Sequence, residues 1–139
     1  MVRATQDVMP DLGESFADDL ASVLFKLKST LDSALGQAVL ATAIELRAHD
    51  GDTHPRAYFD QRMEQLAPMF DAAIERGELP ASVDREELFS FAAGAVYFRT
   101  FIASREVDED FIHAIVANTC WLYCSPSAAA KLSLPARIA

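Results

Sequence analysis

The chain has 139 residues, of which 51% are hydrophobic, and a mean hydropathy of +0.10, which is enough for one domain with its own core. Its net charge of −9 and its pI near 4.6 oppose binding to phosphate backbones, so direct DNA binding by this chain is not expected. No apolar run approaches the ~18 residues that a membrane span requires, and residues 1–10 do not form a signal peptide, so we expect a cytoplasmic location without membrane contact.

The sequence predicts five helices and no strand, so the expected fold is all-α. Residues 1–13 contain Pro10 and Gly13 and are expected to form an N-terminal extension. The first helix is predicted over residues 14–31, where apolar side chains recur every three or four positions. Phe25 lies on the opposite, otherwise polar side, so it either packs on a neighbouring element or lines a cavity.

The second helix is predicted over residues 35–48, which are rich in alanine and other small residues. Polar residues 48–55 follow and end in proline, so this segment is expected to be an exposed loop. His49 and His54 are interpreted as surface residues; the alternative is a metal pair with Asp50 and Asp52, but the spacing fits no established ligand pattern.

The third helix is predicted from Pro55, a residue tolerated in a first turn, to Arg76, after which Gly77 supplies a left-handed cap. Pro68 lies in its middle and removes a backbone hydrogen bond, which predicts a kink. Either the helix is simply bent where it packs, or the bend opens a pocket beside Met63, Met69 and Phe70.

The fourth and fifth helices are predicted over residues 85–104 and 109–124, with Asp84 and Asp108 as N-caps. Both are apolar on more than one side, which favours burial against a second subunit. Cys120 and Cys124 are interpreted as core thiols, with zinc binding, redox sensing or a cross-dimer bridge as alternatives. Residues 125–139 carry two prolines and are expected to be a disordered tail.

Four motifs occur in a fixed order between residues 76 and 109. They are Arg76-Gly77-Glu78-Leu79, then Val83-Asp84-Arg85-Glu86, then Gly94 followed by Tyr97-Phe98-Arg99, and finally Glu106-Val107-Asp108-Glu109. In this order and spacing, the chain resembles the C-terminal domain of tetracycline-repressor-like (TetR) transcriptional regulators. The resemblance is densest over residues 60–118 and covers an expected effector domain at residues 14–124.

The resemblance implies that an apolar small molecule binds in a cavity of the domain and that the last two helices form a four-helix bundle across a homodimer. It also implies a basic N-terminal helix-turn-helix that binds operator DNA, and nothing like it precedes Glu14, so this chain is expected to lack that DNA reader. Candidate effector-binding residues are Phe25, Tyr58, Met63, Phe70, Tyr97 and Phe101. Candidate dimer-interface residues are Phe91, Ala95, Phe98, Ile102, Phe111, Ile115 and Leu122.

Alternatives remain for several of these side chains. The candidate effector-binding aromatics could instead close a dry core, and Arg99 is either an anion partner pointing inward or a member of an exposed or interfacial ion pair. No catalytic motif or cofactor-binding loop is found, so an enzyme is not expected and neither a cofactor nor a metal is assigned. The function predicted is therefore ligand sensing and dimerisation for a transcriptional repressor; the alternative is a non-DNA-binding interaction module that heterodimerises with a related regulator.

Overall fold

A computed structural model describes residues 12–50 and 53–126. These residues form five α-helices, one π-helical turn and no strand, which confirms the all-α prediction for this part of the chain. The helices are α2 (Phe16–Asp32), α3 (Ala34–Asp50), α4 (Thr53–Glu75), α5 (Arg85–Tyr97) and α6 (Glu109–Tyr123), and the π turn η1 (Phe98–Ile102) continues α5. No helix among the described residues is long and apolar enough to cross a membrane.

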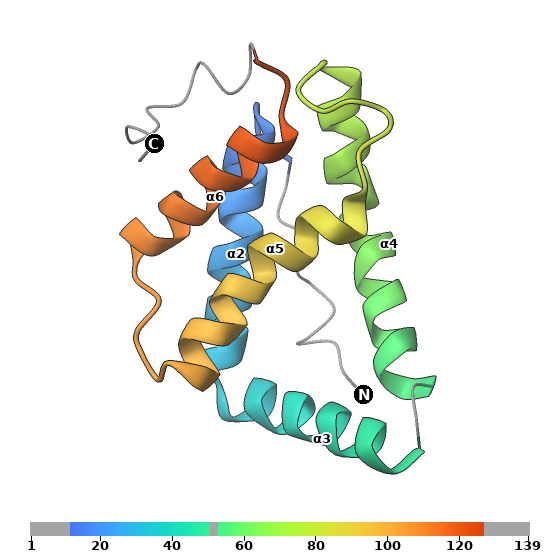
Figure 1. Cartoon of the computed structure of the whole chain (residues 1–139), viewed down its shortest axis with the longest axis vertical. Helices are drawn as coiled ribbons and strands as arrows, with labels where there is room; N and C mark the ends of the chain where they lie inside the picture. The colour runs from blue at the N-terminus through green and yellow to red at the C-terminus, as the bar shows by residue number, and fades with distance from the viewer. Residues whose placement is uncertain (1–11, 51–52, 127–139) are drawn as a thin grey trace.

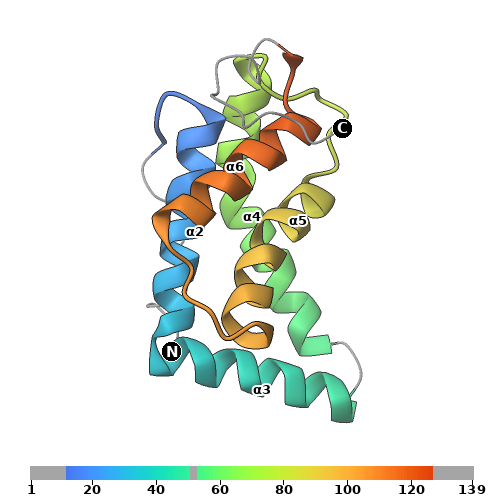
Figure 2. The same ribbon diagram turned by 60° about the vertical axis from the view of Figure 1, so that its left-hand side comes forward.

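Helix α2 is the central element of the domain. It contacts α3, α4, α5 and α6, and α5 and α6 lie across it on one side, while α3 runs across one end of the domain (Figure 1, Figure 2). Its buried apolar residues recur every three or four positions, as predicted, and they are Phe16, Leu20, Val23, Leu24, Leu27 and Leu31. Because α2 occupies the middle, the apolar helix α5 is a covering helix with one side left open.

The start of α2 is fixed by a polar cluster that the sequence did not predict. The Ser15 side chain accepts a hydrogen bond from the Asp18 amide (3.1 Å), and the Glu78 carboxylate accepts one from the Phe16 amide (3.1 Å). Asp19 is buried; its Oδ1 accepts from the Gly13 amide (2.6 Å), and its Oδ2 lies 3.7 Å from the Arg76 guanidinium. These caps satisfy amides that have no partner inside the helix, so α2 begins at Phe16 and not at residue 14.

The connection between α3 and α4 is shorter than expected. Helix α3 continues to Asp50 and α4 begins at Thr53, so the prediction of a loop over residues 48–55 is wrong for residues 48–50 and 53–55. Proline in the first turn of a helix costs no hydrogen bond, which allows α4 to begin before Pro55. The side chains of His49 and His54 lie outside the described part of the chain, and so does the metal pair suggested for them.

Pro68 lies inside α4, which is one helix from Thr53 to Glu75. Pro68 itself is exposed, so the helical hydrogen bond that it removes is on the solvent side. Helix α4 ends at Glu75, one residue before the predicted Arg76. Gly77 follows in the predicted left-handed conformation, and its φ of 78° is strained for any residue with a side chain.

The end of α5 differs from the single predicted helix over residues 85–104. The regular α-helix stops at Tyr97, and the Ala103 amide then bonds the Phe98 carbonyl (2.9 Å), five residues back, in the wider π turn. The turn closes at Ser104, which has φ 51°, and the Arg105 amide bonds the Arg99 carbonyl (2.9 Å). Hydrophobic periodicity does not distinguish an α turn from a single π turn, because the residues joined by the backbone hydrogen bond are four apart in one and five apart in the other.

Candidate association face and effector region

Four of the predicted interface residues on α5, η1 and α6 are large, apolar and exposed. The exposed fractions are 61% for Phe91, 61% for Phe98, 69% for Ile102 and 63% for Leu122. We refer to these four residues as the association face. Apolar groups of this size that remain in contact with water are characteristic of a surface that another molecule covers.

The other predicted interface residues lie deeper. Ala95 and Phe111 are half-buried and pack against the core, and Ile115 is only 7% exposed and belongs to the core itself. Trp121, which was not among the predicted interface residues, is 44% exposed beside Leu122. The sequence contains an indication of this exposure, because Trp121 is a large aromatic residue that lies outside the two apolar sides of α6.

A ring contact and a hydrogen bond join α5 to the end of α6, in addition to their packing in the core. The ring of Phe91 lies 6.4 Å from the ring of Tyr123, and the Tyr123 hydroxyl donates a hydrogen bond to Glu87 Oε2 (2.8 Å). Glu87 lies three residues after Asp84, the N-cap of α5. Its amide donates to the Asp84 carboxylate (3.0 Å), while its own carboxylate binds α6 through Tyr123.

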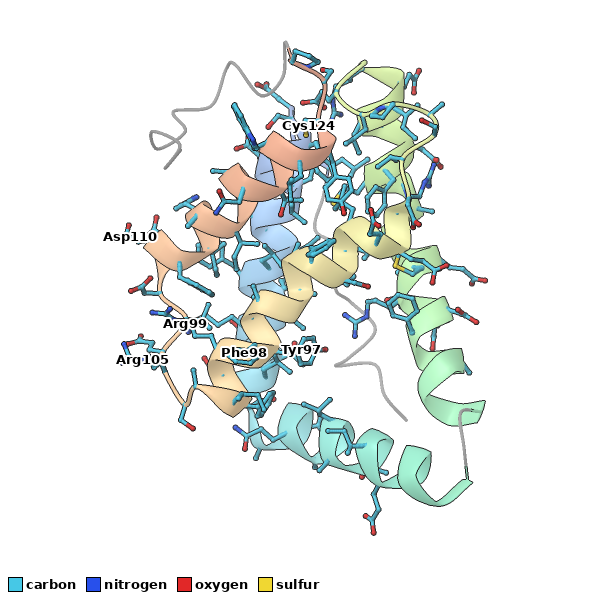
Figure 3. All side chains as sticks on the ribbon, viewed as in Figure 1. Tyr97, Phe98, Arg99, Arg105, Asp110 and Cys124 are labelled. Atoms are coloured by element: carbon cyan, nitrogen blue, oxygen red, sulfur yellow. The ribbon has the colours of Figure 1, made fainter. Side chains whose placement is uncertain are left out.

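Arg99 joins η1 to the start of α6. Its guanidinium lies 4.1 Å from the centre of the Phe111 ring, and its Nε donates to the Glu106 carbonyl (3.1 Å). Tyr97 and Arg99 extend to opposite sides of the helix, with Phe98 between them (Figure 3). The contacts found for Arg99 are therefore a cation–π interaction and a backbone hydrogen bond, and the side chain orders the turn before α6.

The Tyr123 contact predicts a measurable pH dependence. Partial desolvation and the hydrogen bond to Glu87 raise the pKa of Tyr123 to about 12. Because the folded-state pKa lies above the unfolded value of about 10, the stabilisation is complete below about pH 10 and is lost as pH rises towards 12. In an absorbance titration of the three tyrosines, one is expected to ionise late in the wild type, and Tyr123→Phe should remove that step. A late step that persists in Tyr123→Phe would contradict the assignment.

Phe70, one of the candidate effector-binding residues, lies in the core. It is fully buried, its ring is 5.8 Å from the ring of Phe16, and the Arg85 guanidinium lies 5.5 Å from its centre. For Phe70 the structure therefore favours the alternative of a packed core.

The remaining candidates lie at the margin of the core. Tyr97 and Met63 are half-buried, and Phe101 is 37% exposed with its ring 6.4 Å from that of Tyr97. Phe25 is half-buried and meets His113 of α6 edge-on at 6.0 Å, so its ring contact is on the α6 side. The structure thus brings Tyr97 and Phe101 together, and the side chain of Tyr58 lies outside the described residues.

Comparison with known proteins identifies the domain. The sequence matches the family described as "Tetracyclin repressor-like, C-terminal domain" over residues 9–119. The chain belongs to this family. It is also 25% identical over 112 residues to the "Uncharacterized HTH-type transcriptional regulator YdeS" of Bacillus subtilis (strain 168), a match that covers 79% of this chain and 56% of that protein. The chain therefore spans little more than half the length of this curated relative. No solved structure matches the present chain.

The match confirms the resemblance to a TetR C-terminal domain, a regulator-family domain and not an enzyme, and the motifs between residues 76 and 109 lie within the matched residues. The structure gives a physical role to residues of each motif. Gly77 and Glu78 cap α4 and α2, Asp84 and Asp108 cap α5 and α6, and Arg99 holds η1 against α6.

The two cysteines of this TetR domain are free, with Cys120 buried and Cys124 half-buried at the end of α6. A hydrogen bond between the thiols lowers the pKa of Cys120, and the same bond together with burial raises the pKa of Cys124. Because Cys120 is shielded by its own subunit, it is not placed to form a bridge with a partner.

Proposed function

We propose that this TetR C-terminal domain binds a small apolar effector and forms a homodimer through the association face. The observation that carries the proposal is the arrangement at the end of α5. Tyr97 and Phe101 form a ring pair at the margin of the core, and the neighbouring Phe98 and Ile102 are exposed. One helical segment therefore contributes to the candidate effector region and to the candidate dimer contact.

This arrangement supports regulation by population shift. An effector that prefers one position of the Tyr97–Phe101 pair would also favour one position of Phe98 and Ile102, because the residues alternate along the same turn. In a dimer, such a shift changes how two subunits are oriented. We propose that DNA recognition is performed outside these 139 residues, because their net charge of −9 repels phosphate backbones.

The test is a thermal-unfolding screen of the purified chain against uncharged apolar compounds. A compound present at about 100 times its Kd should add about 2.7 kcal/mol of stability, which corresponds to a rise in Tm of roughly 10 °C for a domain of this size. Replacing Tyr97 with Ala should reduce that rise, because the variant removes one wall of the proposed site.

Leu35→Ala provides the matched control, because Leu35 is an exposed apolar side chain of another helix, α3, and is not among the candidate effector-binding residues. It should retain the full response to the compound. If Tyr97→Ala and Leu35→Ala respond as the wild type does, the compound binds elsewhere and the effector region is misplaced. If the chain is monomeric alone but pairs with a related regulator, the heterodimerising module is the better description.

A further inference from the structure

We propose that two copies of this chain cross at Gly94, so that the two-fold axis of the dimer passes between Gly94 of one subunit and Gly94 of the other. The inference rests on the proposed homodimer and adds where its helices meet. It rests on Gly94, because neither the backbone conformation nor the packing of the single subunit requires a glycine at this position.

Gly94 lies within the regular helix α5. Glycine in a helix interior is less favourable than alanine, because it loses more backbone freedom on folding and has no side chain to pack. A helical glycine therefore usually has a local reason, either a left-handed conformation or a neighbour that leaves no room for a Cβ.

Neither reason applies to Gly94 within its own subunit. Among the described glycines only Gly77 has a positive φ, and a Cβ built on Gly94 would meet nothing within 4 Å apart from its own helix backbone. Gly36 illustrates the contrasting case, since a Cβ there would collide with the Thr30 carbonyl oxygen. The space that Gly94 leaves open is thus available to another molecule.

The position of Gly94 shows what kind of contact fits. It lies three residues after Phe91 and four before Phe98, and both of these rings are 61% exposed. On an α-helix these spacings place the three residues on one side. Gly94 is therefore the floor of a notch between two exposed rings, into which a second helix can pack at short distance.

The charge pattern favours a second copy of the chain as the occupant. Residues 88–98 contain no Asp, Glu, Lys or Arg, whereas the whole chain carries a net charge of −9. Like charges placed opposite each other oppose association, so two acidic molecules associate more favourably through a surface without carboxylates. Across a two-fold axis, residue i of one copy contacts residue j of the other and the reverse, so only residues at the axis itself meet their own symmetry mates. A glycine at that position allows the closest approach of the two backbones.

Gly94→Ala tests the crossing because its two expected effects have opposite signs. In the dissociated subunit, alanine should raise the Tm, since the added methyl group has open space and alanine favours the helix. In the dimer, two methyl groups would meet at the axis, and overpacking of this kind should raise the dissociation constant about tenfold to a hundredfold. Sedimentation over a concentration series measures the dissociation constant, and unfolding of the dilute chain measures the Tm.

Ser90→Ala is the matched control, because Ser90 is an exposed residue one turn earlier in α5 and the substitution adds no volume. It should leave the dissociation constant within a few fold of the wild type. As a second measurement, Gly94→Cys should form a cross-linked dimer on oxidation with copper phenanthroline, since a disulfide requires Cα atoms closer than about 7 Å. The oxidised wild type controls for Cys120 and Cys124.

The outcomes separate this inference from the proposed function. A dimer that Gly94→Ala weakens and Gly94→Cys cross-links places the axis at Gly94. A wild-type dimer that tolerates Gly94→Ala as well as Ser90→Ala, and that gains no cross-link from Gly94→Cys, overturns the crossing and leaves dimerisation intact. A wild-type chain that is monomeric at all concentrations overturns the dimer itself.

Discussion

Phe98→Glu is expected to leave the subunit folded and to convert the chain from a dimer to a monomer. Phe98 is 61% exposed in the subunit, so the new carboxylate is hydrated when the chain is alone and is buried only on association. An unpaired charge in an interface costs about 3 to 5 kcal/mol, which corresponds to a dimer weakened by a factor of about a hundred or more. Sedimentation equilibrium at micromolar concentration measures the change. Placing a charge at Ala95 should also disrupt the dimer, but Ala95 packs against the core, so that variant tests folding and association together.

Leu35→Glu is the matched control for Phe98→Glu. Leu35 is 54% exposed on α3, so the variant also replaces an exposed apolar side chain by a carboxylate and adds the same negative charge. It should not change the association state. Equal weakening of the dimer by both variants would mean that general charge repulsion is responsible. If Phe98→Glu did not weaken the dimer, η1 would not be part of the interface.

The helix starts were predictable because each depends on a short local pattern. Asp84 and Asp108 accept hydrogen bonds from the amides of Glu87 and Phe111, as the sequence predicted. These contacts span three residues, so no knowledge of the tertiary structure is needed. The same holds for Gly77, whose left-handed conformation ends α4.

Features that depend on distant contacts were not predictable in the same way. The carboxylate of Glu78 caps α2 from 62 residues away, and Asp19 is buried beside Arg76 of a different segment. Arg99 was expected in an ion pair or as an anion partner, but it lies over the Phe111 ring, which only the fold brings close.

The division between core and interface was only partly predictable. Phe91, Phe98 and Ile102 of the predicted interface are exposed, while Ile115 lies in the core. Periodicity indicates which residues share a side of a helix, but an apolar helix has two apolar sides and periodicity does not say which one meets α2. The exposure of Gly94 between two phenylalanines also depends on this choice.

Phe70→Ala is expected to produce the largest loss of stability of any variant considered. The side chain is fully buried against Phe16, so truncation removes apolar contacts and leaves a cavity in a packed core. The expected cost is about 3 to 5 kcal/mol, a large part of the roughly 5 to 15 kcal/mol that stabilises a typical domain. Urea unfolding at one fixed chain concentration measures the loss, because dimer dissociation otherwise contributes to the transition.

Phe101→Ala is the matched comparison for the stability loss of Phe70→Ala. Phe101 is 37% exposed and lies beside Tyr97, so its truncation opens no enclosed cavity and should cost distinctly less than that of Phe70. If Phe70→Ala costs no more than Phe101→Ala, the ring of Phe70 borders space that is already open. The effector site would then extend along α4 to Phe70 and would not be confined to the region of Tyr97 and Phe101.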